Sequence, residues 1–170
     1  MSGQQSQAQA GYLEMARYNR WVNERLYEVC AGLPDIERKR DLKIFFRSVH
    51  GTLNHLLLTD KVWLGRLNGT PFAVAGLGDE LYADFEKLRA ARRELDEAIL
   101  AWVAGLSARQ LDGELRYTRV SQRQEMNKPM RTVLLHWFNH QTHHRGQLTA
   151  LLAQLGCDYG DVDLLMMPQG

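Results

Sequence analysis

The stretch from Val133 to Leu155 constrains the fold more than any other part of this 170-residue chain. Its apolar side chains recur every three or four residues, which is the spacing of one face of an amphipathic α-helix. That face includes His140 and His144, which are four residues apart and so lie one turn apart on the same side of the helix. Because the pattern places core residues at these positions, we expect both imidazoles to point towards the interior.

Two buried imidazoles need polar partners, because an unpaired polar group in a protein interior is costly. A single metal ion could satisfy both, since each ring nitrogen can approach a zinc-like ion to about 2.0–2.1 Å. Hydrogen bonds to carboxylates, hydroxyl groups or water would also satisfy them, and the spacing alone leaves both interpretations open. A metal site would need a third ligand from elsewhere in the chain.

Three further segments have the period of long helices. They span residues 9–31, 41–67 and 79–106. Gly32 and Pro34 follow the first segment and Gly69 follows the second, which are typical signals for the end of a helix. Asp79 is the predicted N-cap of the third. Four such helices joined by loops predict an all-α protein, folded as a four-helix bundle without a second domain.

The segment between residues 111 and 130 has a different period, and it directly precedes the histidine helix. Leu115 and Tyr117 alternate with polar residues, which predicts a short β-hairpin or an extended loop. We expect this segment to cover a metal site or to line its mouth. Residues 1–10 are interpreted as a disordered lead-in, or as an extension of the first helix, and residues 11–170 as a single domain.

The composition excludes several classes of protein. A net charge of +1 provides no overall field to attract nucleic acid or an anionic membrane. The arginine-containing clusters at residues 37–40 and 89–93 are interpreted as solvated helix faces or helix ends. Cys30 and Cys157 are isolated, which suits a reducing compartment. With no secretory signal and no apolar run of the length of a membrane span, a cytoplasmic protein is expected.

Two residues of the second segment stand out as candidates for polar contacts. Asp60 falls in the middle of an apolar face, so its carboxylate must be paired, hydrogen-bonded or close to a cation. His55 lies on the other side of the same helix, among apolar neighbours that permit an interior position without requiring it. His50 has no comparable support and is predicted to lie at the surface or behind a ligand.

Three motifs of the chain resemble those of the DinB family. Residues 139–147, NHQTHHRGQ, resemble the family's HxxxHRGQ signature. Residues 53–57, LNHLL, followed by Asp60 and Trp63, resemble its second-helix motif, and residues 18–23, YNRWVN, resemble its YNxWxN motif. The matches span nearly the whole chain in the family's order.

The resemblance implies a four-helix bundle, often dimeric, with three histidine ligands for a divalent transition metal. Carried over by motif, the ligands are His55, His140 and His144, with His55 placed mainly by the resemblance. Zinc and nickel suit imidazole ligands, and iron and manganese bind them less tightly. His136, one turn before His140, and Asp60 are candidates for orienting the ligands or for proton transfer.

Three protein nitrogens leave one coordination position open, which is typical of a catalytic site. The first hypothesis is therefore a metal-dependent enzyme that acts on a small molecule, either by transfer to a low-molecular-weight thiol or by hydrolysis. The second is a non-catalytic metal-binding protein, for example one of a stress response. The third is a structural bundle in which the three histidines are hydrogen-bonded core residues. A homodimer is expected from the family.

Overall fold

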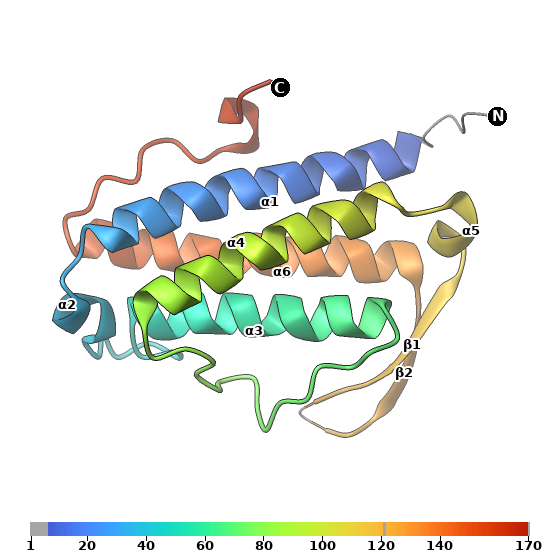
Figure 1. Ribbon diagram of the computed structural model, residues 1–170, viewed down its shortest axis with the longest axis horizontal. Helices are drawn as coiled ribbons and strands as arrows, with labels where there is room; N and C mark the ends of the chain where they lie inside the picture. The colour runs from blue at the N-terminus through green and yellow to red at the C-terminus, as the bar shows by residue number, and fades with distance from the viewer. Residues whose placement is uncertain (1–6, 121, 170) are drawn as a thin grey trace.

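Four long helices lie side by side in the computed structural model, which describes residues 7–120 and 122–169 (Figure 1). They are α1 (Gln7–Ala31), α3 (Val49–Leu67), α4 (Phe85–Ala104) and α6 (Met130–Gln154). Helix α1 packs against α4 and α6, and α3 packs against the same two helices. The four therefore enclose one core, and the four-helix bundle predicted from the sequence is confirmed.

The connection between α3 and α4, residues 68–84, runs back along the length of the bundle (Figure 1). Helix α4 therefore begins at the same end as α3 and runs parallel to it. Helices α1 and α6 are also parallel to each other, whereas α3 and α6 are antiparallel (Figure 1). This long crossover replaces one of the short turns of a simple up-and-down bundle, and it brings the loop alongside α3.

Helix α3 begins at Val49, so the predicted start at residue 41 is wrong. Ser48 is the N-cap, and its Oγ accepts a hydrogen bond of 3.0 Å from the backbone N–H of Gly51. Lys43 and Arg47 have φ angles of 58° and 67°, which an α-helix does not allow. The apolar spacing continues upstream of Ser48 by coincidence, since Phe45 is 89% exposed.

A short helix, α2 (Asp35–Lys39), lies in the same connection and was not predicted. Helix α4 begins at Phe85, so its predicted start at Asp79 is also wrong. Asp84 caps it by accepting a hydrogen bond of 2.8 Å from the N–H of Lys87. Asp79 has the same capping chemistry, but its carboxylate accepts hydrogen bonds from backbone N–H groups within the preceding loop.

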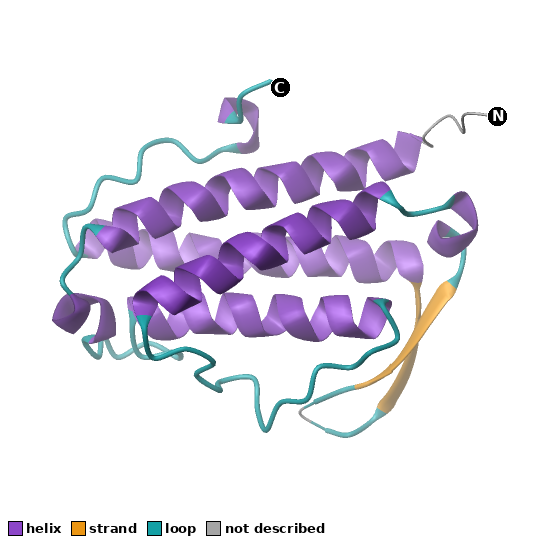
Figure 2. Cartoon of the chain, in the orientation of Figure 1, coloured by secondary structure: helices purple, strands orange, loops and turns teal. Residues whose placement is uncertain are grey.

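The predicted hairpin is present between α4 and α6. Strands β1 (Glu114–Thr118) and β2 (Glu125–Pro129) pair antiparallel, with Tyr117 opposite Met126 (Figure 2). A short helix, α5 (Ala108–Leu111), precedes them, and a 3-10 turn, η1 (Leu164–Met166), lies in the C-terminal segment.

The N-terminal segment divides at the first described residue. Residues 7–10 of the expected lead-in belong to α1, and residues 1–6 lie outside the described residues. None of the helices in the described part of the chain is long and apolar enough to cross a membrane.

Candidate metal centre

His55 on α3 meets His140 and His144 on α6 where these two helices pack together. The Nε2 atom of His144 lies 3.2 Å from Nε2 of His55 and 3.1 Å from Nε2 of His140. One ring nitrogen from each histidine lies within 4.8 Å of the other two. The three residues that the resemblance implied as ligands therefore form one cluster, and their role as ligands remains a prediction.

The geometry of this cluster fits a single cation. Nitrogen ligands at about 2.0–2.1 Å from a tetrahedral zinc ion are about 3.3–3.4 Å apart. The two Nε2–Nε2 distances, 3.2 and 3.1 Å, are close to this value. Unprotonated ring nitrogens so close together repel one another through their lone pairs unless a cation or a proton lies between them. The donor set therefore matches one shared divalent ion.

Hydrogen bonds on the far side of two rings determine which nitrogen faces the centre. His55 Nδ1 donates to the carbonyl oxygen of Leu77, and His144 Nδ1 donates to Oε1 of Gln147, each at 2.8 Å. An oxygen of this kind only accepts, so Nδ1 carries the proton and Nε2 keeps its lone pair in the neutral ring. Such outer partners commonly orient metal ligands. The buried Nδ1 of His140 has no partner among the described residues.

Burial keeps these histidines in the form that binds a metal. It lowers the pKa of His55 to about 4. The pKa of His140 is lowered to about 3, mainly by burial and further by the neighbouring histidines. Burial also lowers the pKa of His144. At neutral pH the three rings are therefore uncharged, as metal ligation requires.

An aromatic ring from the loop before α3 shields one side of the cluster. The Phe46 ring stacks on His55, with centroids 3.8 Å apart and an angle of 19° between the planes. It also meets His144 edge-on at 5.4 Å. The loop that was expected to be helical thus packs directly against the centre.

A cavity of about 270 Å³ adjoins the cluster on the side of His140. His136 lines it one turn earlier on α6, with its ring centroid 5.9 Å from that of His140. The hairpin contributes Tyr117 and Met126 to the wall, as expected for a segment at the mouth of the site. Burial, with a smaller effect from Arg66, lowers the pKa of His136. The proton-transfer role of His136 stays a prediction.

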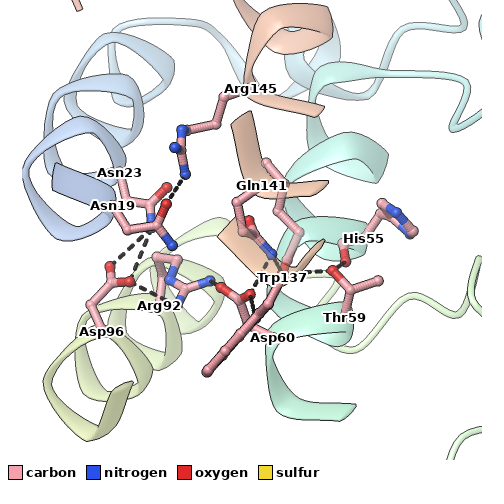
Figure 3. A network of polar contacts seen from close by, with 11 residues as sticks. Asn19, Asn23, His55, Thr59, Asp60, Arg92, Asp96, Trp137, Gln141 and Arg145 are labelled. Atoms are coloured by element: carbon pink, nitrogen blue, oxygen red, sulfur yellow. Dashed lines mark hydrogen bonds and ion pairs between the residues drawn. The ribbon is translucent and has the colours of Figure 1, made fainter. Parts of the chain in front are cut away.

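Asp60 lies in a buried network of polar contacts that, among the described residues, reaches the backbone carbonyl of His55 but not its ring (Figure 3). Its side chain is fully buried. Oδ2 accepts from Nη1 of Arg92 at 2.7 Å, and Oδ1 accepts from Nε1 of Trp137 at 2.6 Å and from Nε2 of Gln141. Within the described part of the chain, no hydrogen bond joins Asp60 to the three histidines. Its contacts are those of a structural carboxylate between α3, α4 and α6.

The network continues to α1 through side chains that the sequence motifs contain (Figure 3). Arg92 pairs with Asp96 at 2.8 Å, and an Asp96 oxygen accepts from Nδ2 of Asn23 at 3.0 Å. Arg145 of the histidine helix donates to Asn19. Burial lowers the pKa of Arg92, but the two aspartates raise it by more, so its pKa lies above the ordinary value.

Two sequence interpretations are corrected at these positions. Arg92 is only 2% exposed, whereas the cluster at residues 89–93 was expected to be solvated. Its position four residues after the buried Leu88 and four before Asp96 was a signal that could have revealed a buried ion pair. His50 is 1% exposed and donates to the carbonyl oxygen of Tyr82 at 2.8 Å, so the predicted surface position is also wrong.

Comparison with known proteins identifies the family. The sequence pattern of the DinB family matches residues 1–169. The chain belongs to the DinB family. It is 25% identical over 167 residues to protein DinB of Bacillus subtilis (strain 168), covering 86% of this chain and 90% of that relative.

Two solved structures have a similar fold. A DinB-like protein from Bacillus cereus has a TM-score of 0.68 at 18% identity, over 91% of this chain and 97% of the other. YfiT from Bacillus subtilis has a TM-score of 0.63 at 15% identity, over 93% of each chain. YfiT is described as a probable metal-dependent hydrolase with an unusual four-helix bundle topology.

In this DinB-family chain, motif residues contribute to two places, the histidine cluster and the buried network. His55, His140, His144 and Gln147 form the cluster or orient it. Five further motif side chains lie in the buried network; they are Asn19, Asn23, Asp60, Gln141 and Arg145. No bond between Gln147 and His144 was predicted from the sequence, although their spacing of three residues permits the one observed.

Proposed function

We propose that this protein is a metal-dependent hydrolase that acts on a small molecule. The observation that carries the proposal is the convergence of three Nε2 atoms beside a cavity of about 270 Å³. The description of YfiT as a probable metal-dependent hydrolase supports the same reaction class.

His55, His140 and His144 would hold a divalent cation, with zinc or nickel favoured by the imidazole donors and iron or manganese as alternatives. A cation held by three protein nitrogens keeps one position open, and there it would acidify a water molecule and polarise a substrate carbonyl. Leu77 and Gln147 hold two of the rings in the orientation that this requires.

His136 is the side chain best placed to move a proton. It lines the cavity beside His140, and its lowered pKa leaves the ring neutral at pH 7. A neutral imidazole can accept a proton from an attacking water and return it to the leaving group. The Trp63 ring packs edge-to-face against the His136 ring, with the two ring centroids 5.3 Å apart.

The test is hydrolysis of a panel of small amides and esters by the zinc- or nickel-loaded protein. We expect turnover that disappears in His140→Ala/His144→Ala. We expect His136→Gln to lower kcat about 10²–10⁴-fold while metal content is unchanged, as for loss of a general acid–base group. Turnover that is equal in the double variant would contradict the proposal.

Transfer to a low-molecular-weight thiol is a second candidate, because the cavity wall has no acidic side chain among the described residues. A thiol that carries carboxylates could therefore approach without repulsion. Turnover that requires an added thiol and releases no hydrolysis product would favour this reaction. Stoichiometric metal with no turnover in either assay would favour the non-catalytic metal-binding alternative.

A further inference from the structure

Arg66 lines the same cavity as His136 and His140, from the last turn of α3. Its guanidinium carbon lies 4.6 Å from the ring centroid of Trp63 and 4.5 Å from that of Tyr117. Its Nη2 donates to the carbonyl oxygen of Thr118 at 2.9 Å. The guanidinium is therefore held between a helix and the hairpin by two aromatic contacts and one hydrogen bond.

Among the described residues, the charge of this guanidinium has no counter-ion. No carboxylate pairs with Arg66 in the described part of the chain, whereas Arg92 is paired even though it is buried and Arg131 is paired at the surface. Burial lowers the pKa of Arg66, as expected for a half-buried charge without a partner. Arg119 adds a second positive charge to the same wall.

The cavity connects this charge to the candidate metal centre. His55 and Arg66 lie on the same helix eleven residues apart, which is about 16 Å between their Cα atoms. The long arginine side chain shortens the distance that a ligand has to span. Thr59 and Trp63, which lie between these two residues on α3, line the cavity, and so does His140 of the histidine cluster. A small molecule bound in this cavity can therefore contact both Arg66 and His140.

We propose that Arg66 is the anion-binding residue of the substrate pocket. The substrate class is a small molecule with an anionic oxygen group at one end, an apolar or aromatic body, and its hydrolysable bond near His140. The guanidinium has N–H groups beyond the one that contacts Thr118, and these can donate to a carboxylate or a phosphate. Trp63 and Tyr117 provide the apolar wall. This inference rests on the proposed function for the position of the reacting bond.

The test measures binding rather than turnover, by titration calorimetry on the metal-loaded protein. The probes are hippurate, phenyl phosphate and the uncharged hippuramide. Arg66→Gln keeps a donor for Thr118 and removes the charge, and the exposed Arg109→Gln is the matched control. We expect one or both anions to bind wild type at least tenfold more tightly than hippuramide. Arg66→Gln should bind that anion about 10- to 100-fold more weakly than wild type, whereas Arg109→Gln should bind it with unchanged affinity.

Arg66→Lys guards against a variant that simply fails to fold, because it keeps the charge and should retain part of the preference for anions. Equal binding of anions and hippuramide, or wild-type anion binding by Arg66→Gln, would overturn the inference. The result is independent of the hydrolase proposal. A protein without metal or turnover that still binds anions through Arg66 would contradict that proposal alone. A hydrolase without Arg66-dependent binding would contradict only this inference.

Discussion

The bond from His144 to Gln147 shows how one outer side chain can determine the chemistry of a ligand. With Nδ1 donating to Gln147 at 2.8 Å, the lone pair of Nε2 is directed at the centre. The spacing of the histidines was readable in the sequence because the helical period is regular. The bond to Leu77 was not, because its acceptor is a backbone carbonyl in a loop with no pattern.

Removal of the Gln147 side chain should weaken the metal site without unfolding the helix. We expect Gln147→Ala to lower metal affinity about 10- to 100-fold, the usual effect of losing such a partner. Gln154→Ala, near the end of the same helix, should leave it unchanged. Competition with a chromogenic chelator measures both. Equal affinity in the two variants would show that Gln147 does not orient the ligand.

Loss of the Asp60 carboxylate should affect stability more than the loss of a surface carboxylate. Asp60→Asn removes the charge opposite the buried Arg92, which keeps only Asp96, and we expect a loss of about 3 kcal/mol. Asp112→Asn, at the exposed pair with Arg131, should cost less than about 1 kcal/mol. Urea unfolding measures both, and a similar loss for the two would refute a structural role for Asp60.

At the scale of elements, periodicity identified the four long helices but misplaced two of their starts. Ser48 and Asp84 decide where α3 and α4 begin, and each competes with other capping residues nearby. The choice depends on tertiary contacts, such as the close approach of the Phe46 carbonyl to Gly51, which one sequence does not show.

Two helical glycines should respond in opposite directions to alanine. A Cβ at Gly51 would lie 2.1 Å from the Phe46 carbonyl oxygen, so Gly51→Ala must displace the loop that stacks on His55. We expect it to destabilise by about 1–3 kcal/mol. Apart from its chain neighbours and its own helix backbone, no described atom lies within 4 Å of the Cβ position of Gly146, so Gly146→Ala should stabilise by about 0.5–1 kcal/mol. Chemical denaturation distinguishes them; a stabilising Gly51→Ala would show that this contact is not tight.

At the scale of the whole molecule, the amphipathic segments predicted a bundle but not its connections. Residues 69–78 have no helical pattern and residues 79–84 were expected to be helical, so nothing in the sequence indicated a connection that returns along the bundle (Figure 1). The buried network was only partly foreseeable, because Asp60 stood out within an apolar face whereas its partner Arg92 resembled a surface residue. The homodimer implied by the resemblance stays a prediction, to be checked by sedimentation.

The metal-free protein should become less stable in mild acid. The folded-state pKa values of His55 and His140, about 4 and about 3, lie below the ordinary value of 6.5. As the pH falls from about 6.5 towards 4, the unfolded chain takes up protons that the folded chain does not, so unfolding is favoured. Urea midpoints at pH 7 and pH 5 measure the loss. The His140→Ala/His144→Ala variant should lose less stability than wild type between these two pH values. An equal loss would contradict the conclusion that the buried histidines are neutral in the folded protein.

The most direct test of the central claim is the metal content of the protein, purified without a histidine tag and measured by elemental analysis. The three converging histidines predict about one equivalent of zinc, nickel, iron or manganese per chain. His140→Ala/His144→Ala should lose it while circular dichroism shows an intact fold. If neither protein holds a metal, even after reconstitution with each of the four, the histidines are not ligands and the proposed chemistry has no basis.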